Sequence, residues 1–188
     1  MIPYLAETPV LETARLILRA PIASDWEPAL AFMVTQRAQY MGGPYERSDA
    51  WRGFNHVVGH WVTRGYGMFT YCDKTTGRPM GFVGPFYPEG WTEPEIGWSI
   101  WSSADEGKGF VLEAAQAARG YVYEVLNWST AISYIDPGNA RSIALARRLG
   151  CEIDPNGTLP DGKDWPGTLV FRHPSPDTFV EGGVEAYA

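Results

Sequence analysis

Few cysteines, no long apolar run and no leader-like start narrow the classes of protein that this sequence encodes. Only Cys72 and Cys151 are present in 188 residues, which excludes a small fold held together by several disulfides. No stretch approaches the ~18 consecutive apolar residues of a membrane-spanning helix. The first residues carry neither the basic nor the apolar region of a secretion signal. We therefore expect a cytoplasmic protein with no membrane partner.

Basic residues and histidines are also scarce. There are 15 Lys and Arg against 22 Asp and Glu, and the formal net charge is -7. Nucleic acid attracts proteins through clustered basic residues, so we expect no nucleic-acid partner and a mild preference for cationic substrates. His56 and His60 are four residues apart, but Val57 stands where a zinc-protease helix carries glutamate. We therefore expect no metal.

What the sequence does contain is enough apolar material for one domain. Hydrophobic residues make up 45% of the chain, and we find no internal repeat or low-complexity block, which disfavours a solenoid or a disordered chain. Residues 173–188 are rich in Pro, Gly and acidic residues. We expect a single domain over residues 1–172 and a C-terminal tail over residues 173–188.

The hydrophobic pattern alternates between strand and helix signals. Strands are expected over residues 13–20, 68–72, 79–83, 95–101, 130–135 and 168–172, and helices over 26 onward, 48–64, 110–126 and 139–150. The strand, helix and strand between residues 95 and 135 predict a parallel pair, because such a crossover joins parallel strands. The whole pattern predicts an α/β (α+β) fold with a mixed sheet.

A glycine-rich turn leads directly into the helix that begins near Phe110. Gly107 and Gly109 flank Lys108, and glycine lets backbone N–H groups approach a ligand closely, while a helix N-terminus favours an anion. The turn lacks the Ser or Thr of a Walker loop, and Leu112 replaces the third glycine of a Rossmann fingerprint. A phosphate-bearing ligand of another kind is therefore the first hypothesis.

Four motifs in this order resemble the GCN5-related N-acetyltransferase (GNAT) superfamily, in particular its bacterial ribosomal-protein alanine acetyltransferases (RimJ and RimL). They are T-A-R-L-I-L-R at 13–19, E-I-G-W at 95–98, G-K-G-F-V-L-E-A at 107–114 and N-A-R-S-I-A-L-A-R-R-L-G-C at 139–151. The resemblance implies a central mixed sheet of about six or seven strands flanked by about four helices. It also implies acetyl-CoA as co-substrate and a homodimer.

The same resemblance assigns roles to individual residues. It implies direct acetyl transfer to a primary amine, on a protein N-terminus or a small molecule, without a metal. Glu95 becomes the candidate base, and Ser142 the candidate donor to the departing sulfur. The implied coenzyme-binding residues are Ile100, Trp101, Gly107, Lys108, Gly109, Phe110, Asn139 and Ser142.

Two departures from the family pattern leave an alternative open. Ala104 stands where Gln or Arg is usual before the glycines, and Ala146 stands where many relatives carry a general-acid tyrosine. A noncatalytic acyl-CoA-binding or sensing domain with the same fold is therefore the second hypothesis. For an enzyme, the acidity and the many aromatic residues suit a cationic amine in an aromatic-lined cleft. Those aromatic residues, near the early helices and the hairpin, are Trp51, Trp61, Tyr66, Phe86 and Trp91.

Overall fold

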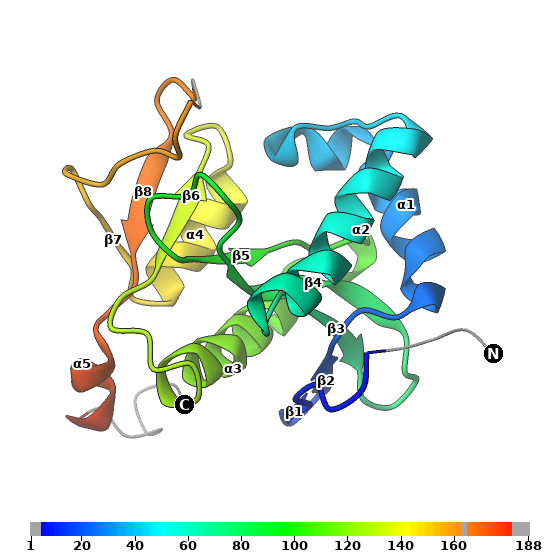
Figure 1. Cartoon of the computed structure of the whole chain (residues 1–188), viewed down its shortest axis with the longest axis horizontal. Coiled ribbons are helices and arrows are strands. Elements are labelled where there is room, and N and C mark those ends of the chain that lie inside the picture. The colour runs from blue at the N-terminus through cyan, green and yellow to red at the C-terminus, as the bar shows by residue number, and fades with distance from the viewer. Residues whose placement is uncertain (1–4, 163–164, 182–188) are drawn as a thin grey trace.

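A computed structural model describes residues 5–162 and 165–181 of the chain. Eight strands form one sheet in the order β1-β2-β3-β4-β5-β6-β8-β7 (Figure 1). Their bounds are Leu11–Glu12 (β1), Leu16–Arg19 (β2), Phe69–Asp73 (β3), Pro79–Phe86 (β4), Glu95–Trp98 (β5), Ile132–Ile135 (β6), Glu152–Ile153 (β7) and Leu169–Arg172 (β8). The α-helices are Trp26–Met33 (α1), Arg47–Arg64 (α2), Phe110–Glu124 (α3), Ala140–Arg148 (α4) and Pro176–Glu181 (α5). Short 3-10 turns cover Ala23–Asp25 (η1), Gln36–Met41 (η2) and Ser103–Asp105 (η3).

The helices cover both faces of the sheet, as the alternation of side chains along β4 illustrates. Val83 belongs to a core cluster with the α3 alanines Ala114 and Ala118, whereas its neighbour Phe82 packs with Phe54 of α2. Successive strand residues point to opposite faces, so α3 lies against one face and α1 with α2 against the other. Figure 1 shows α4 beside β6 and β8, on the other half of the molecule.

The sheet divides between β5 and β6, the pair that the sequence predicts to be parallel. They are parallel, but the register contains a single pair, Glu95 with Ile132, next to a hydrogen bond from Ser133 Oγ to the Ile96 carbonyl. Beyond this point the chain that leaves β5 stays with β4, because Ser99 N donates to Phe82 O at 2.8 Å. The two halves of the sheet therefore separate on the C-terminal side of β5.

Ser99 also marks an irregularity that bends the strand. Its hydroxyl, rather than its carbonyl, accepts the Phe82 N–H at 3.0 Å, while its carbonyl accepts the Tyr71 hydroxyl at 2.9 Å. A Cβ on Gly81 would lie 2.1 Å from that carbonyl oxygen, so only glycine fits there. Local disruption of a ladder in this way bends a strand, which explains why β5 ends at Trp98 and not at the expected residue 101.

The element counts differ modestly from the expected six or seven strands and four helices. The additional strands β1 and β7 have two residues each, too few to show a periodic pattern. At the other end, beyond the expected boundary at residue 172, His173 is buried and its backbone N–H donates to the Ala131 carbonyl. Residues 176–181 of the expected tail form α5, and residues 182–188 lie outside the described part.

Helix α2 turns only some of its apolar side chains toward the core. Phe54 and Trp61 are buried, but Trp51 is 50% exposed and Val62 is 69% exposed. His60 is the unexpected buried residue: its Nδ1 lies 2.7 Å from Tyr66 O, and its Nε2 accepts the Tyr87 N–H at 2.9 Å. Its pKa is lowered by burial, so it holds α2 against the end of β4 as a neutral ring.

Candidate active site

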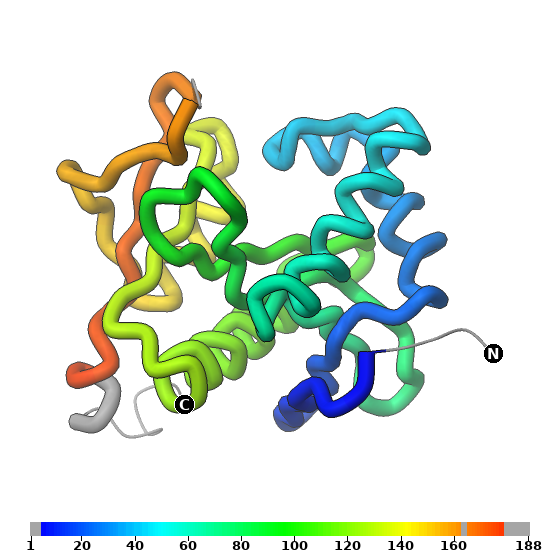
Figure 2. Tube along the Cα trace, in the orientation of Figure 1, coloured from blue at the N-terminus to red at the C-terminus, as the bar shows by residue number. Residues whose placement is uncertain are grey.

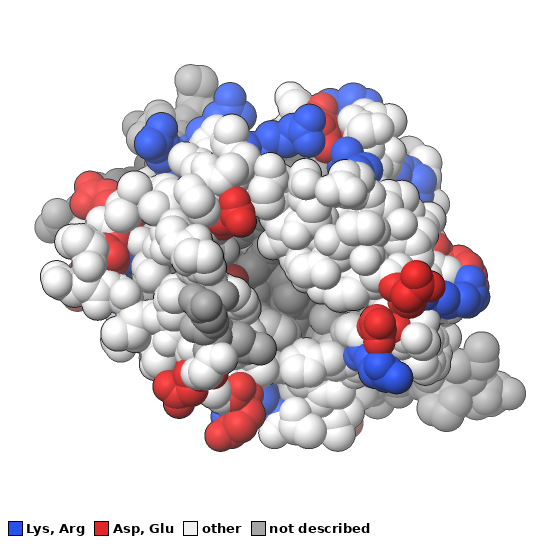
Figure 3. Space-filling view, turned by 90° about the horizontal axis from the view of Figure 1, so that it is seen from above, with Lys and Arg blue, Asp and Glu red and all other residues white. Residues whose placement is uncertain are grey.

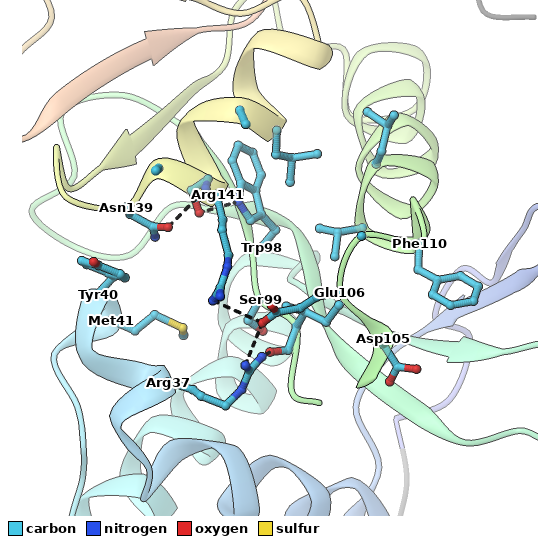
Figure 4. A pocket seen from close by; sticks show the side chains of 18 of the residues that line it. Arg37, Tyr40, Met41, Trp98, Ser99, Asp105, Glu106, Phe110, Asn139 and Arg141 are labelled. Carbon is cyan, nitrogen blue, oxygen red and sulfur yellow. Dashed lines mark hydrogen bonds and ion pairs between the residues drawn. The ribbon is translucent and has the colours of Figure 1, made fainter. Parts of the chain in front are cut away.

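A cavity of about 870 Å³ opens where the two halves of the sheet separate. Its walls come from η2, the glycine turn, the start of α3 and the start of α4. Figure 4 shows Trp98 and Asn139 on one side of it and the Arg37 and Glu106 side chains on another. Segments far apart in the sequence thus meet around one space.

The glycine turn supplies the polar backbone of this cavity. Gly107 and Gly109 have φ angles of +72° and +78°, a region that other residues enter only with strain. The first helical hydrogen bond of α3 runs from Glu113 N to Gly109 O, so the preceding amides have no carbonyl within the helix. Gly107, Gly109 and Phe110 line the cavity, and this turn therefore presents donors suited to an anion.

Lys108 lies between the two glycines but is not among the described residues that line this cavity. Its carbonyl accepts a hydrogen bond from Arg15 Nη1 at 2.9 Å, and Arg15 Nε pairs with Glu113 at 2.6 Å. On the other side of the turn, the buried Asp105 carboxylate accepts hydrogen bonds from both terminal nitrogens of Arg78, each at 2.9 Å. Asp105 lines the cavity, whereas its partner Arg78 and the pair of Arg15 and Glu113 do not. These contacts hold the turn, so the donors are positioned in advance.

Two arginines converge on Glu106 inside this cavity. Arg37 Nη1 lies 2.7 Å from the Glu106 carboxylate and Arg141 Nη1 lies 3.4 Å from it, as the dashed lines in Figure 4 mark. Arg37 also donates to the Ile100 carbonyl at 3.1 Å, and its Nε is buried without a partner among the described residues. Arginine forks suit phosphates, so the cavity matches an anionic ligand such as the pyrophosphate of a coenzyme.

The two expected backbone contacts after β5 are not equivalent. Trp101 N donates to Met80 O at 2.9 Å, so this amide is already engaged in the sheet, and the Trp101 side chain is buried against Phe82. The Ile100 amide lies between Ser99 and Trp101, whose N–H groups both face β4, and alternation turns it toward the opposite edge. Ile100 lines the cavity and is the better candidate of the two.

Asn139 and Ser142 lie together at the start of α4. Asn139 Oδ1 accepts the Ser142 N–H at 3.2 Å, which caps the helix, as is common for asparagine at a helix start. Trp98 Nε1 donates to Ser142 Oγ at 3.2 Å. Because the hydroxyl accepts this bond, its own hydrogen is available to donate to a ligand.

A second cavity of about 660 Å³ shares Trp98, Asn139 and Ser142 with the first. Figure 3 shows the surface hollowed near the centre of the view, with mostly uncharged residues bordering the hollow. The wall of the second cavity includes parts of the segment between β4 and β5 and of the segment before β8. The course of both segments can be followed in Figure 2. The two cavities thus meet at Ser142, one side suited to an anion and the other mostly apolar.

Glu95 lies in the second cavity. Its Oε2 accepts the Trp91 indole N–H at 2.8 Å. Burial raises the pKa of this carboxyl to about 7, against the lowering effect of hydrogen bonds from Trp91 and the Tyr134 backbone. A Cβ on Gly97 would lie 3.2 Å from Met68 Cε and in ordinary contact with Glu95 Oε1 at 3.9 Å, so the glycine of E-I-G-W accommodates Met68. A carboxyl with a pKa near the working pH is suited to accept a proton.

The aromatic lining of the second cavity differs from the expected set. Phe86 and Trp91 are part of it, whereas Trp61 is in the core and Trp51 lies on the outer surface of α2. Tyr66 packs against Trp128 instead. The lining residues that sequence reasoning missed are Trp165, Tyr134, Trp98 and, in the first cavity, Arg37. Trp98 lies in the E-I-G-W motif but was given no role. The sequence carries no local signal for the other three, because their neighbours come from distant segments.

Neither a metal centre nor a membrane span is found in the described part of the chain. Within residues 5–162 and 165–181, no three His, Cys, Asp or Glu side chains gather as a metal site. In those same ranges, no helix has the length and hydropathy needed to cross a bilayer.

Comparison with known proteins agrees with this geometry. The chain is 32% identical to an acetyltransferase from Agrobacterium tumefaciens str. C58, with a TM-score of 0.83 over 93% of this chain and 99% of that one. It is 34% identical over 91 residues to the protein YkkB of Bacillus subtilis (strain 168), a match covering 46% of this chain. The matched region spans 52% of that curated relative.

Two more distant structures share the fold. One is RimL, a ribosomal L7/L12 alpha-N-protein acetyltransferase, with a TM-score of 0.68 and 16% identity over 92% of this chain and 97% of that one. The other is aminoglycoside acetyltransferase AAC(6')-Ib in complex with coenzyme A, with a TM-score of 0.69 and 17% identity over 88% of this chain and 97% of that one. Ribosomal-protein acetyltransferases, the group suggested by the sequence motifs, are thus among the structures with this fold.

A family model described as an acetyltransferase (GNAT) domain matches residues 15–152. These residues include β5, the glycine turn and α4, which line the two cavities, whereas Trp165 of the second cavity lies beyond the matched region. The chain therefore belongs to the GNAT family of acetyltransferases.

Proposed function

We propose that this chain transfers the acetyl group of acetyl-CoA directly to a primary amine, with both substrates bound at once. The observation that carries the proposal is the meeting of two unlike cavities at Trp98, Asn139 and Ser142. One cavity offers backbone donors and arginines for phosphates. The other holds a carboxyl group whose pKa is about 7.

The coenzyme side of the site is assigned to the glycine turn and its neighbours. The amides of Gly107, Gly109 and Phe110 would hold the pyrophosphate, supported by the positive end of the α3 dipole. Arg37 and Arg141 would move from Glu106 to the incoming phosphates, because a phosphate offers them more acceptor oxygens than one carboxylate. AAC(6')-Ib, which shares the fold, is known in complex with coenzyme A.

The transfer step requires groups on three sides of the thioester. Glu95 accepts the proton that the amine loses as its nitrogen bonds to the carbonyl carbon. The Ile100 amide donates to the carbonyl oxygen while negative charge develops on it. When the carbon–sulfur bond breaks, its electron pair stays on sulfur, and the Ser142 hydroxyl donates to that sulfur. No covalent intermediate with the protein is formed.

The noncatalytic alternative rests on Ala146, which is buried in the core. Ser142, one turn earlier on α4, lines both cavities instead. A donor to the leaving sulfur is thus available without a tyrosine at position 146. Dimer formation and a cytoplasmic location stay predictions from the sequence.

Replacing Ser142 by alanine tests its assignment to the leaving sulfur. A hydrogen bond to a charged group contributes about 1.5–3 kcal/mol, so kcat is expected to fall roughly 10- to 100-fold. The affinity for acetyl-CoA, measured by calorimetry, is expected to stay within about twofold of the unmodified protein's. The reason is that the Asn139 side chain still accepts the backbone N–H of residue 142 and caps α4.

Ser129→Ala serves as the matched control, since Ser129 is exposed and lies outside both cavities. If Ser142→Ala turned over as fast as this control, the hydroxyl would have no part in the transfer.

A further inference from the structure

We infer that the acceptor is a monoamine, a primary amine joined by a short chain to an aromatic or similarly apolar body, and not a polycation or a protein N-terminus. The inference rests on the proposed function and assigns the second cavity to the acceptor. It draws on the walls of that cavity, its charges and the hydrogen-bonding state of its polar groups.

The walls around Glu95 are a continuous aromatic cluster. Trp91 packs edge to face with Phe86, Tyr134 and Trp165, with ring centroids 5.6, 6.4 and 5.9 Å apart. Tyr134 and Trp165 close the cluster at 6.0 Å. Aromatic rings attract an ammonium group by their electron-rich faces and an apolar body by burial. This lining therefore suits a ligand with a single charge and an apolar remainder.

The charges in the cavity match one ammonium group. Glu95 is the enclosed carboxylate, with the indole N–H of Trp91 on one oxygen. The other carboxylate of the lining, Asp136, is exposed and accepts the Gly138 N–H at 2.7 Å. Neither Lys nor Arg occurs among the described residues that line the cavity. A polyamine or an aminoglycoside brings further ammonium groups, and beside Glu95 the lining offers them only the exposed Asp136, so burying them in the aromatic part of the cavity is costly.

A peptide acceptor would meet the same difficulty with its backbone. Three of the lining hydroxyls are already engaged: Tyr134 donates to Thr158 O at 2.9 Å, Ser133 donates to Ile96 O at 2.7 Å, and Tyr45 bonds to Met41 O. The Ser142 hydroxyl keeps its hydrogen, which the transfer step assigns to the leaving sulfur. Each peptide N–H or C=O buried here without a partner would cost about 1–3 kcal/mol. A compact amine has no such groups.

Direct binding of amines tests the inference independently of turnover. With the protein saturated with coenzyme A, calorimetric titration with phenethylamine and tryptamine is expected to show saturable binding at least about tenfold tighter than spermidine, kanamycin or an alanine-initiated tetrapeptide. Comparable or tighter binding of any of the latter three would overturn the inference, and so would no binding of either aromatic amine.

A tryptophan variant locates the binding site. Trp165→Ala removes one wall of the cluster and is expected to weaken phenethylamine binding roughly 10-fold, the size of a desolvated cation–π contact, while the affinity for coenzyme A is unchanged. Trp51→Ala is the matched control, because Trp51 is exposed on α2 outside both cavities. Equal phenethylamine affinity in the two variants would place the amine elsewhere and contradict the inference.

The failure of the proposed function has a different signature. If acetyl-CoA does not bind, or if it binds and no amine is ever acetylated, the transfer proposal is wrong. The amine titrations, repeated on the free protein if the coenzyme does not bind, would still report on the cavity, because they do not depend on chemistry.

Discussion

Replacing Glu95 by glutamine is expected to lower kcat/KM by roughly 100- to 10,000-fold, the range observed when a general base is lost. Glutamine keeps the size of the side chain and an oxygen for the Trp91 indole N–H, which lies 2.8 Å from the carboxylate. It cannot accept the proton of the amine. The affinity for acetyl-CoA should change little, since Glu95 lines the second cavity and not the first.

The pH dependence provides a separate signature of this role. Burial raises the pKa of Glu95 to about 7, so the carboxyl is protonated below that value and ionised above it. Activity of the unmodified enzyme is therefore expected to rise with pH through about 7, measured as kcat/KM with a saturating second substrate. In Glu95→Gln this step should disappear from the profile.

Glu89→Gln is the control that isolates the position. Glu89 lies in the same connection between β4 and β5, and its side chain is fully exposed beside Arg64. This variant should keep both the rate and the pH step. An unaltered pH profile in Glu95→Gln would show that another group, or water alone, accepts the proton.

Changing Gly109 to glutamate is expected to weaken acetyl-CoA binding at least about 100-fold. Two effects combine: a side chain at a φ of +78° costs about 1–2 kcal/mol, and displaced amides lose hydrogen bonds to a charged phosphate, each contributing about 1.5–3 kcal/mol. The new carboxylate would also stand at the anion-binding end of α3. Calorimetric titration with acetyl-CoA measures the effect directly.

Gly65→Glu controls for the backbone strain. Gly65 ends α2 with the same φ of +78°, and its surroundings are open. The Gly65→Glu variant should lose about as much stability in thermal unfolding as Gly109→Glu does, but it should bind acetyl-CoA as tightly as the unmodified protein. If Gly109→Glu bound acetyl-CoA as tightly as Gly65→Glu, the glycine turn could not be the pyrophosphate site.

The elements around the coenzyme cavity could be predicted from sequence because their signals are local. The glycines lead into α3, Asn139 caps α4, and Gly150 follows it with a φ of +76°, each from residues within one or two turns. The Trp101 amide, which we expected to contact the coenzyme, donates to Met80 O. Which amides along a strand are free depends on its pairing partner, and this pairing is not visible in β5 alone.

The acceptor side could not be predicted in the same way. Its aromatic cluster joins Trp91 to Trp165, from segments more than 70 residues apart in sequence. Composition showed that aromatic residues were plentiful and acidic residues in excess, which favoured a cationic amine. Composition could not show that Trp51 lies outside the second cavity and that Tyr134 lines it, because the position of each depends on how the two halves of the sheet separate.

The most direct test of the account is a steady-state measurement with acetyl-CoA and phenethylamine varied together. The account predicts N-acetylphenethylamine and free coenzyme A in equal amounts, with double-reciprocal lines that intersect, because both substrates must be bound before the acetyl group moves. Parallel lines would indicate an acetylated enzyme and contradict direct transfer in a ternary complex. If neither phenethylamine nor any other primary amine were acetylated, the proposed function itself would be wrong.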